Sequence, residues 1–333
     1  MKKTLALILS LFLALTLFGC GGSSSGSKEA KEYNIGVTIY QFDDNFMTLY
    51  RNDITAYFDE LNKKDANTQY KVTIVDAAND MATQTEQVDS FITQKVDVMI
   101  VNLVQTSSGE TIAKKCEEAG IPVVFINREM ADYTYPDNQC YVGADAKQSG
   151  TYQGEIIAAL DNHGDLDGDG QTSYVMIMGD PENSDAQYRT EYSIKALEDA
   201  GVKVNKLYQE TGNWAQDKGQ ELVATALSQF GTKVEVVFCN NDAMALGAYQ
   251  AITAAGRTVG KDIYLVGVDA LAECVKMVQE GTMTGTVLND DAGQATAACD
   301  TAVGYINGTK PEKEVNYIPY VKVTKDNAAD YIK

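Results

Sequence analysis

Short β-rich runs alternate with segments of helical periodicity along most of the chain, and this alternation limits the fold more than any other feature. Strand-like runs occupy residues 35–39, 72–75, 96–104, 121–126, 174–178, 202–208, 234–239, 263–268 and 285–288. Between the first two runs, apolar side chains recur at helical spacing at Phe46, Leu49, Tyr50, Ile54, Tyr57, Phe58 and Leu61. Because helices between strands cover the faces of a sheet, this order predicts an α/β protein with parallel sheets.

The number of these runs predicts two lobes. About 300 residues follow position 33, which is more than one hydrophobic core usually holds. The first series of runs ends near Tyr141, so we place the lobe boundary near residue 140. A helix over 292–307 and a terminal segment at 317–323 make a further passage of the chain between the lobes possible. Two such lobes would enclose a cleft, the usual place for a ligand.

The first 32 residues have the composition of a targeting segment followed by a linker. Lys2 and Lys3 precede an apolar stretch that ends at Gly19-Cys20, an order typical of a secretory signal. A Cys directly after a small residue resembles a bacterial lipoprotein signal, in which Cys20 becomes the lipidated first residue. An ordinary signal cut nearby and an uncleaved anchor helix are the alternatives. We expect a signal at 1–19, a flexible Gly/Ser-rich tether at 20–32, and lipid attachment to the outer face of the cytoplasmic membrane.

Charge and cysteine usage argue against several classes of protein. Without Lys2 and Lys3 the chain has 25 basic and 47 acidic residues, a net charge of −22. Such a surface repels phosphate backbones, which argues against nucleic-acid binding. Five cysteines follow Cys20 without a C-x-x-C pair, and this pattern indicates neither a disulfide framework nor a zinc site.

Polar side chains follow nearly every predicted strand, at the position where sheets of this kind bind ligands. Carboxylates, amides and a guanidinium can each form paired hydrogen bonds with neighbouring hydroxyls. Aromatic rings at Phe46 and Trp214 could cover the apolar faces of a flat ring. This mixture favours a pyranose site over a phosphate or peptide site. The strand-end residues are Asp44, Asn102, Asn183, Asp185, Arg189, Asn241, Asp269 and Asn289.

Each of these residues also has a structural alternative. Asp44, Asp269 and either Asn241 or Asp242 could cap the helices that they precede. Trp214 could be a core or surface aromatic, and Arg189 could be a surface charge on its helix.

An enzyme is a second functional class. A glycosidase could use the pair Asp43/Asp44 or the pair Asp290/Asp291, but adjacency in sequence does not establish the separation that such chemistry needs. The single His163 has no evident Ser or Cys partner.

Residues 165–173 contain an incomplete calcium loop. Asp165, Asp167 and Asp169 occupy positions 1, 3 and 5, with a glycine at position 6. The carbonyl of Gln171 and the hydroxyl of Ser173, or a water there, would continue the coordination. Position 12, which is Glu in an EF-hand, is Met176 within an apolar run. Either the loop is a solvated acidic turn, or its last ligand comes from elsewhere in the fold.

Four stretches, at 38–46, 240–247, 266–270 and 285–290, resemble the bacterial galactose/glucose-binding proteins, which are periplasmic-binding-protein-type receptors of sugar ABC transport. The resemblance extends from about residue 33 to 323. It implies the type I fold, in which two Rossmann-like lobes are joined by a three-segment hinge. The N-terminal lobe would comprise 33–141 plus 289–318, and the C-terminal lobe 142–288 plus 319–333.

The resemblance also implies a function. The chain would be a non-catalytic, monomeric lipoprotein that captures D-glucose or D-galactose and delivers it to the membrane subunits of an ABC permease. A chemoreceptor or sensor kinase as partner, or a different hexose as ligand, is the alternative. The implied sugar contacts are hydrogen bonds from Asp44, Asn102, Asp185, Arg189, Asn241, Asp269 and Asn289, with stacking by Phe46 and Trp214. Asn183 stands where the family has His, which leaves the ranking of glucose and galactose open.

In the same family a Glu from another strand closes the calcium loop, and it aligns with Glu235. The resemblance therefore implies a structural Ca²⁺ held by Asp165, Asp167, Asp169, Gln171, Ser173 and Glu235, with Ser173 in place of the family's Gln. The effector domain of a sugar-responsive repressor shares this fold, but the export signal and the lack of a DNA-binding segment argue against it.

Overall fold

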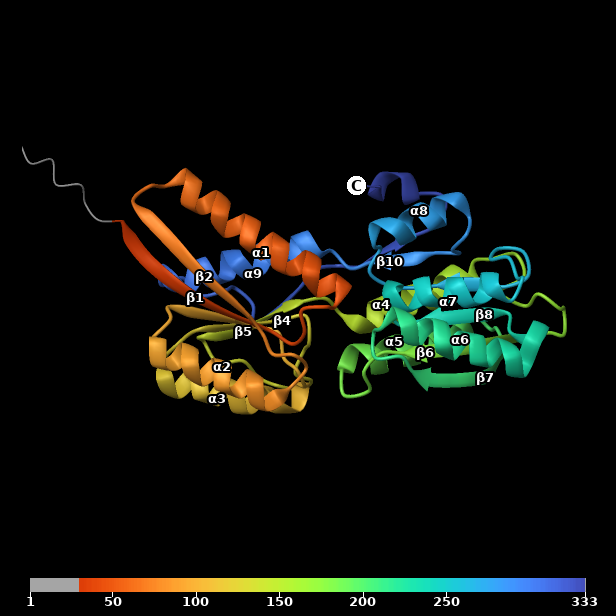
Figure 1. Ribbon diagram of the computed structural model, residues 1–333, viewed down its shortest axis with the longest axis horizontal. Coiled ribbons are helices and arrows are strands. Elements are labelled where there is room, and N and C mark those ends of the chain that lie inside the picture. The colour runs from red at the N-terminus through yellow and green to blue at the C-terminus, as the bar shows by residue number, and fades with distance from the viewer. Residues whose placement is uncertain (1–29, 333) are drawn as a thin grey trace, which may run out of the picture.

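The computed structural model describes residues 30–332, and these residues form two α/β lobes side by side (Figure 1). The predicted signal peptide, the predicted lipidation site Cys20 and most of the predicted tether lie outside the described residues. The first strand, β1 (Lys31–Ile39), begins at Lys31, so the last two residues of the predicted tether belong to the sheet. None of the helices within 30–332 has the length and apolar character needed to cross a membrane.

The N-terminal lobe is built on a six-stranded parallel sheet with the order β11-β5-β4-β3-β1-β2. In the register of β1, Ile35 lies opposite Val72 of β2 and Val98 of β3. The helices α1 and α9 pack on one face of this sheet, and α2 and α3 on the other (Figure 1). The elements up to the first crossing are α1 (Asn45–Lys64), β2 (Thr68–Asp76), α2 (Met81–Gln94), β3 (Val98–Val101), α3 (Gly109–Ala119), β4 (Val123–Ile126) and β5 (Gln139–Gly143).

The C-terminal lobe contains a four-stranded parallel sheet with the order β7-β6-β8-β9. Single bridges from Val266 to Gly285 and from Asp269 to Leu288 extend it toward β10, which pairs antiparallel with β12. The elements are α4 (Ala146–Ala158), β6 (Thr172–Met178), α5 (Ser184–Asp199), β7 (Val204–Thr211), α6 (Gln216–Phe230), β8 (Val236–Cys239), α7 (Asp242–Ala254), β9 (Tyr264–Val266), α8 (Ala272–Glu280), β10 (Thr286–Leu288) and β12 (Val321–Val323).

The chain passes between the lobes three times. It leaves the N-terminal lobe after β5 and returns after β10 to form α9 (Asp291–Ile306) and β11 (Val315–Tyr317). The strand β11 pairs with β5, and the chain then re-enters the C-terminal lobe as β12. The segment that we expected at 317–323 therefore consists of two short strands in different lobes. Pro319 lies between them and has no N–H with which to continue a ladder.

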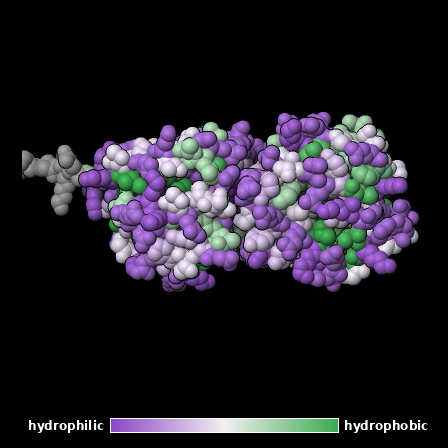
Figure 2. Space-filling model, turned by 90° about the horizontal axis from the view of Figure 1, so that it is seen from below, coloured by the Kyte–Doolittle hydropathy of each residue, from purple (hydrophilic) through white to green (hydrophobic). Residues whose placement is uncertain are grey.

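Apolar side chains fill both lobes, while the surface is polar. The five cysteines within residues 30–332 are buried and unpaired. They contribute to the cores as small hydrophobic side chains. The face of the molecule shown in Figure 2 is largely hydrophilic, with apolar residues in small separate patches. This pattern agrees with the acidic composition of the chain.

Candidate functional site

A cavity lies between the lobes, at the carboxyl ends of their strands. Every lining residue follows β1, β4, β6, β7, β8, β9 or β10 in the chain, as the rule for parallel sheets requires. Among the predicted sugar-binding residues, all but Asn102 line it. The N-terminal lobe contributes Tyr40, Asp44, Phe46, Met47, Asn127 and Arg128; the C-terminal lobe contributes Asn183, Asp185, Arg189, Trp214, Asn241 and Asp269; and Asn289 comes from the second crossing.

The structure does not place Asn102 at the cavity surface. Its side chain is fully buried, where Oδ1 accepts a hydrogen bond from the backbone N of Tyr40 at 3.2 Å. Its Nδ2 donates to Oδ1 of Asn127 at 3.1 Å. Asn102 therefore supports the amide that lines the cavity, Asn127, which the sequence analysis did not identify. Asn127 directly follows the predicted strand 121–126, so the rule applied to the other strands would have found it.

Arg128 is a second lining residue that the sequence analysis missed. It is buried, and its guanidinium carbon lies 3.6 Å from the ring centroid of Tyr40. The Tyr40 hydroxyl in turn donates to Oδ2 of Asp44 at 2.6 Å. An ion pair of 3.8 Å joins Arg128 to Asp180, which lies in the other lobe after β6. Arg128 thus links the cavity wall of one lobe to the rim of the other.

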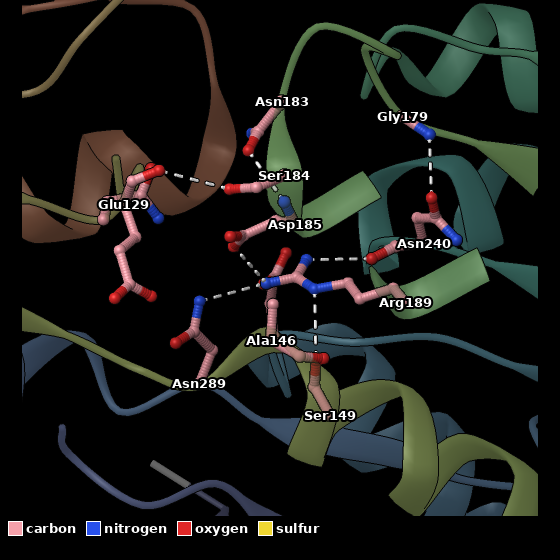
Figure 3. Close-up of polar contacts among 12 residues, drawn as sticks. Glu129, Ala146, Ser149, Gly179, Asn183, Ser184, Asp185, Arg189, Asn240 and Asn289 are labelled. Carbon is pink, nitrogen blue, oxygen red and sulfur yellow. Dashed lines mark hydrogen bonds and ion pairs between the residues drawn. The ribbon is translucent and has the colours of Figure 1, made fainter. Parts of the chain in front are cut away.

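Arg189 is the centre of the polar network in the C-terminal lobe (Figure 3). It is 3% exposed, so the alternative of a surface charge is wrong. Its Nη2 contacts Oδ2 of Asp185 at 3.2 Å and the Tyr320 hydroxyl at 2.9 Å. Nη1 donates to the carbonyl of Asn240 at 2.9 Å, and Nε to the Ser149 hydroxyl at 3.2 Å. This arrangement fixes the guanidinium plane at the cleft.

Burial disfavours the charged forms of two carboxyl groups of the cavity, those of Asp185 and Asp269. Burial raises the pKa of Asp269 well above its ordinary value, and the positive charge of Arg189 offsets only part of this effect. Burial likewise raises the pKa of Asp185, again against the charge of Arg189. The side chain of Asp269 receives one weak hydrogen bond, from Nδ2 of Asn289 at 3.5 Å. Such a carboxylate is a strong acceptor for hydroxyl groups.

Helix capping and cavity lining occur together at three positions. Asp44 accepts a hydrogen bond from the backbone N of Met47 at 2.7 Å, and Asn241 from that of Met244 at 3.0 Å. Asn183 caps α5 in the same way. The capping alternative is therefore correct for Asp44 and Asn241 without removing them from the site. It is wrong for Asp269, because α8 begins three residues later and has no side-chain cap.

Trp214 is held flat against the end of β6. A Cβ at Gly179 would lie 2.2 Å from Cζ2 of the indole, so only glycine leaves room for the ring. Phe46 approaches from the other lobe, at the start of α1. Aromatic side chains thus border the cavity from both lobes.

The proposed acid pairs of a glycosidase do not meet in the cavity. Asp43 is exposed, Asp290 caps α9, and neither Asp290 nor Asp291 lines the site. His163 bonds through Nδ1 to the carbonyl of Ala158, at 2.6 Å, outside the cleft.

The acidic loop forms a separate oxygen cluster in the C-terminal lobe. Asp165, Asp167 and Glu235 each place one carboxylate oxygen within 4.8 Å of the others. Glu235 is 2% exposed and accepts hydrogen bonds from the backbone N of Leu166 at 2.6 Å and of Ser173 at 2.7 Å. The structure does not bring Asp169 into this cluster, because its carboxylate bonds to the backbone and side chain of Gln171. The Ser173 hydroxyl accepts from Nδ2 of Asn205 at 3.1 Å instead.

Comparisons with known proteins agree with this geometry. The family model for the periplasmic binding protein domain matches residues 35–310. The chain is 35% identical to a D-galactose/methyl-galactoside binding periplasmic protein of Haemophilus influenzae, over 100% of both chains. It is 34% identical to a putative rhizopine-binding protein of Rhizobium meliloti, over 95% of this chain and 97% of the relative. A solved ABC transporter solute binding protein of Bacillus halodurans with bound myo-inositol is 29% identical, with a TM-score of 0.79, and the match covers 92% of this chain and 99% of that one.

Proposed function

The chain belongs to the periplasmic binding protein family, and from this premise we propose that it captures D-glucose or D-galactose between its lobes and delivers the sugar to an ABC permease. The family consists of solute-binding receptors of sugar ABC transport rather than enzymes. The observation that carries the proposal is the ring of buried Asp, Asn and Arg side chains at the strand ends, bordered by Phe46 and Trp214. The extent and identity of the match to the galactose-binding relative support this choice of ligand.

The charges of the cavity favour a neutral ligand. Three carboxylates, from Asp44, Asp185 and Asp269, face two guanidiniums, from Arg128 and Arg189. A sugar acid or sugar phosphate would bring further negative charge, at low dielectric, to a site where burial already disfavours the anions of Asp185 and Asp269. A neutral hexose instead offers hydroxyl donors to the carboxylates and hydroxyl acceptors to the guanidiniums.

Contacts between the lobes support capture by closure. Besides the ion pair of Arg128 and Asp180, the hydroxyl of Ser184 donates to the carbonyl of Glu129 at 3.4 Å. Thr106 donates to the carbonyl of Glu182 at the same distance. The first two contacts join the segments after β4 and β6, which both carry lining residues, and the third joins the segment after β3 to the segment after β6. A ligand that bridges both lobes would therefore select the closed form over a more open one.

Fluorescence of the single tryptophan tests the proposal. Because Trp214 borders the cavity, its emission should change saturably when D-glucose or D-galactose is added to the purified protein. The control is the double variant Trp214→Phe/Tyr249→Trp, which moves the tryptophan to α7, away from the cavity. Its emission should show no comparable change. Absence of any change with both sugars in the wild-type protein counts against the proposal.

We further propose that the oxygen cluster binds a structural Ca²⁺. Asp165, Asp167 and Glu235 supply the hard oxygen ligands that this ion prefers, and Glu235 already contacts the loop. Asp169, the Gln171 carbonyl and Ser173 would complete the shell after local rearrangement. The ion would tie the 165–173 loop to the start of β8, within one lobe and away from the sugar.

Calcium should therefore stabilise the protein without changing its sugar preference. At a hundredfold excess over its dissociation constant, Ca²⁺ should add about 2.7 kcal/mol to the free energy of unfolding. Urea unfolding with Ca²⁺ and with EDTA measures this difference. The substitution Glu235→Gln should remove it, whereas the exposed control Glu273→Gln should retain it. Stabilisation that survives Glu235→Gln unchanged would refute the assignment.

We also propose that Cys20 carries the lipid anchor, on the basis of the signal-like residues that precede it. Expression in a bacterial host with radiolabelled palmitate should label the wild-type chain, and Cys20→Ser should abolish the label. Labelling that persists in Cys20→Ser would contradict this proposal. The matched control Cys116→Ser, at a buried core position, should leave it unchanged.

A further inference from the structure

Asp242 is a buried carboxylate that does not line the cavity. It is the first residue of α7, directly after the lining residue Asn241, and its side chain is fully buried. One of its oxygens points to the chain segment that follows β9, and the other points to the start of β10. Oδ2 accepts a hydrogen bond from the backbone N of Leu271 at 2.9 Å, and Oδ1 accepts one from the Thr286 hydroxyl at 2.7 Å.

These hydrogen bonds converge on the backbone around Asp269. The Thr286 hydroxyl that donates to Asp242 also accepts a bond from the backbone N of Ala270, at 3.3 Å. The two amides that follow Asp269 are thus both held by Asp242, one directly and one through Thr286. On the other side of Asp269, a Cβ at Gly267 would lie 2.2 Å from Oδ1 of Asp242, so the carboxylate packs against the backbone there as well.

The backbone that Asp242 holds is strained. Asp269 has a φ of 126° and Ala270 a φ of 54°, in a region where residues with a Cβ are uncommon. Such conformations persist where the surrounding structure over-determines them, and they are frequent at ligand-binding positions. Asp269 itself is fixed to β10 through its N, which donates to the carbonyl of Val287 at 2.8 Å. The carbonyl of Asp269 accepts a bond from the backbone N of Asn289 at 3.4 Å, and the amides of the next two residues are held by the Asp242 network.

We propose that Asp242 is a positioning residue for ligand recognition. By holding the amides of Ala270 and Leu271, it keeps Asp269 in the backbone conformation that directs its carboxylate into the cavity. Asp242 touches no ligand; it acts through Asp269 alone among the lining carboxylates. The effect on affinity rests on the function proposed above, since it requires that Asp269 bind a hydroxyl of the sugar.

A double-mutant cycle tests this role against a purely structural one. Dissociation constants for D-glucose and D-galactose are measured by calorimetry for Asp242→Asn alone and combined with Asp269→Asn or with Asp44→Asn. Asp242→Asn alone should weaken binding about tenfold. The same loss should recur with Asp44→Asn, whose residue lies in the other lobe, and should nearly vanish with Asp269→Asn. Equal losses in both backgrounds, or no loss at all, overturn the proposal.

Thr286 supplies an independent variant should Asp242→Asn unfold. Thr286→Val removes the hydroxyl and should weaken binding, whereas Thr286→Ser retains it and should bind within about twofold of the wild type. Equal affinities for Val and Ser at this position count against the network.

Amide hydrogen exchange tests the backbone part without any sugar. Exchange at Ala270 and Leu271 should accelerate in Asp242→Asn or Thr286→Val, relative to the Ala113 amide in α3 of the other lobe. Unchanged exchange overturns the proposal whatever the ligand. Accelerated exchange in a protein whose wild type binds neither sugar would instead contradict the proposed function and leave the backbone role of Asp242 supported.

Discussion

Replacing Arg189 with Met is expected to weaken sugar binding at least about a hundredfold and to lower the free energy of unfolding by about 3–5 kcal/mol. The guanidinium is buried and makes four polar contacts, to Asp185, Tyr320, Asn240 and Ser149. Without it the Asp185 carboxylate, which is 5% exposed, loses its charged partner. The loss of stability comes mainly from leaving the buried Asp185 charge without a partner, and less from losing the attraction within the pair.

Two further variants separate stability from recognition. Adding Asp185→Asn to Arg189→Met removes the unpaired charge, so much of the stability should return while binding stays weak. Arg257→Met removes a half-buried arginine of the same lobe that pairs with Asp262 outside the cleft, and it should leave sugar affinity unchanged. Calorimetry and urea unfolding measure both quantities. An affinity of Arg189→Met within tenfold of the wild type would contradict the place of this residue in the site.

Asp269→Asn is expected to weaken sugar binding by about a hundredfold and yet to stabilise the ligand-free protein at neutral pH, by about 1–3 kcal/mol. Burial raises the pKa of the Asp269 carboxyl in the folded protein. The folded chain then binds this proton more readily than the unfolded chain, in which the pKa is about 3.9. The carboxyl therefore does not lower the free energy of unfolding at pH values below the unfolded-state pKa. It lowers this free energy increasingly as the pH rises toward the folded-state pKa.

The stability difference between Asp269→Asn and the wild type should accordingly be small near pH 4 and increase toward pH 8. Urea unfolding across this range measures it, with the exposed Asp217→Asn as a control that should show neither effect. A variant that is less stable than the wild type at pH 8 would show that the carboxylate stabilises the apo protein and would contradict this account. The expected result means that the site stores unfavourable electrostatic energy, which ligand hydroxyls relieve.

Much of the site was predictable because parallel sheets place functional residues by topology. Residues that follow neighbouring parallel strands lie at one edge of their sheet, and this geometry places Asn241 and Asp269 together in the C-terminal lobe. The packing of the two lobes brings Asp44 to the same cavity. The rule failed for Asn102 because the residue still bonds within the sheet, its N donating to the carbonyl of Thr38 at 2.9 Å. Its side chain therefore lies beneath the cavity wall, and the amide of the next strand forms the surface.

Other features depend on contacts between distant segments, which periodicity does not encode. The sequence predicts Asp242 as a possible helix-capping residue. In the structure its side chain accepts hydrogen bonds from Leu271 and Thr286, which are 29 and 44 residues away. The contacts of Glu235 with the acidic loop span a longer separation, 69 residues to Leu166 and 62 to Ser173, and their prediction came only from family resemblance. The local spacing that included Asp169 did not determine where its carboxylate points. Local patterns thus predicted the helices and strands, whereas tertiary packing determines the contacts that their side chains make.

Calorimetric titration of the wild-type protein with D-glucose, D-galactose, D-ribose, D-xylose and myo-inositol tests the central claim most directly. A neutral hexose site of this composition predicts a saturable heat with one sugar per chain. Binding of glucose or galactose should be at least about tenfold tighter than binding of the pentoses or the inositol. No heat with either hexose, or tighter binding of myo-inositol or a pentose, would contradict the account.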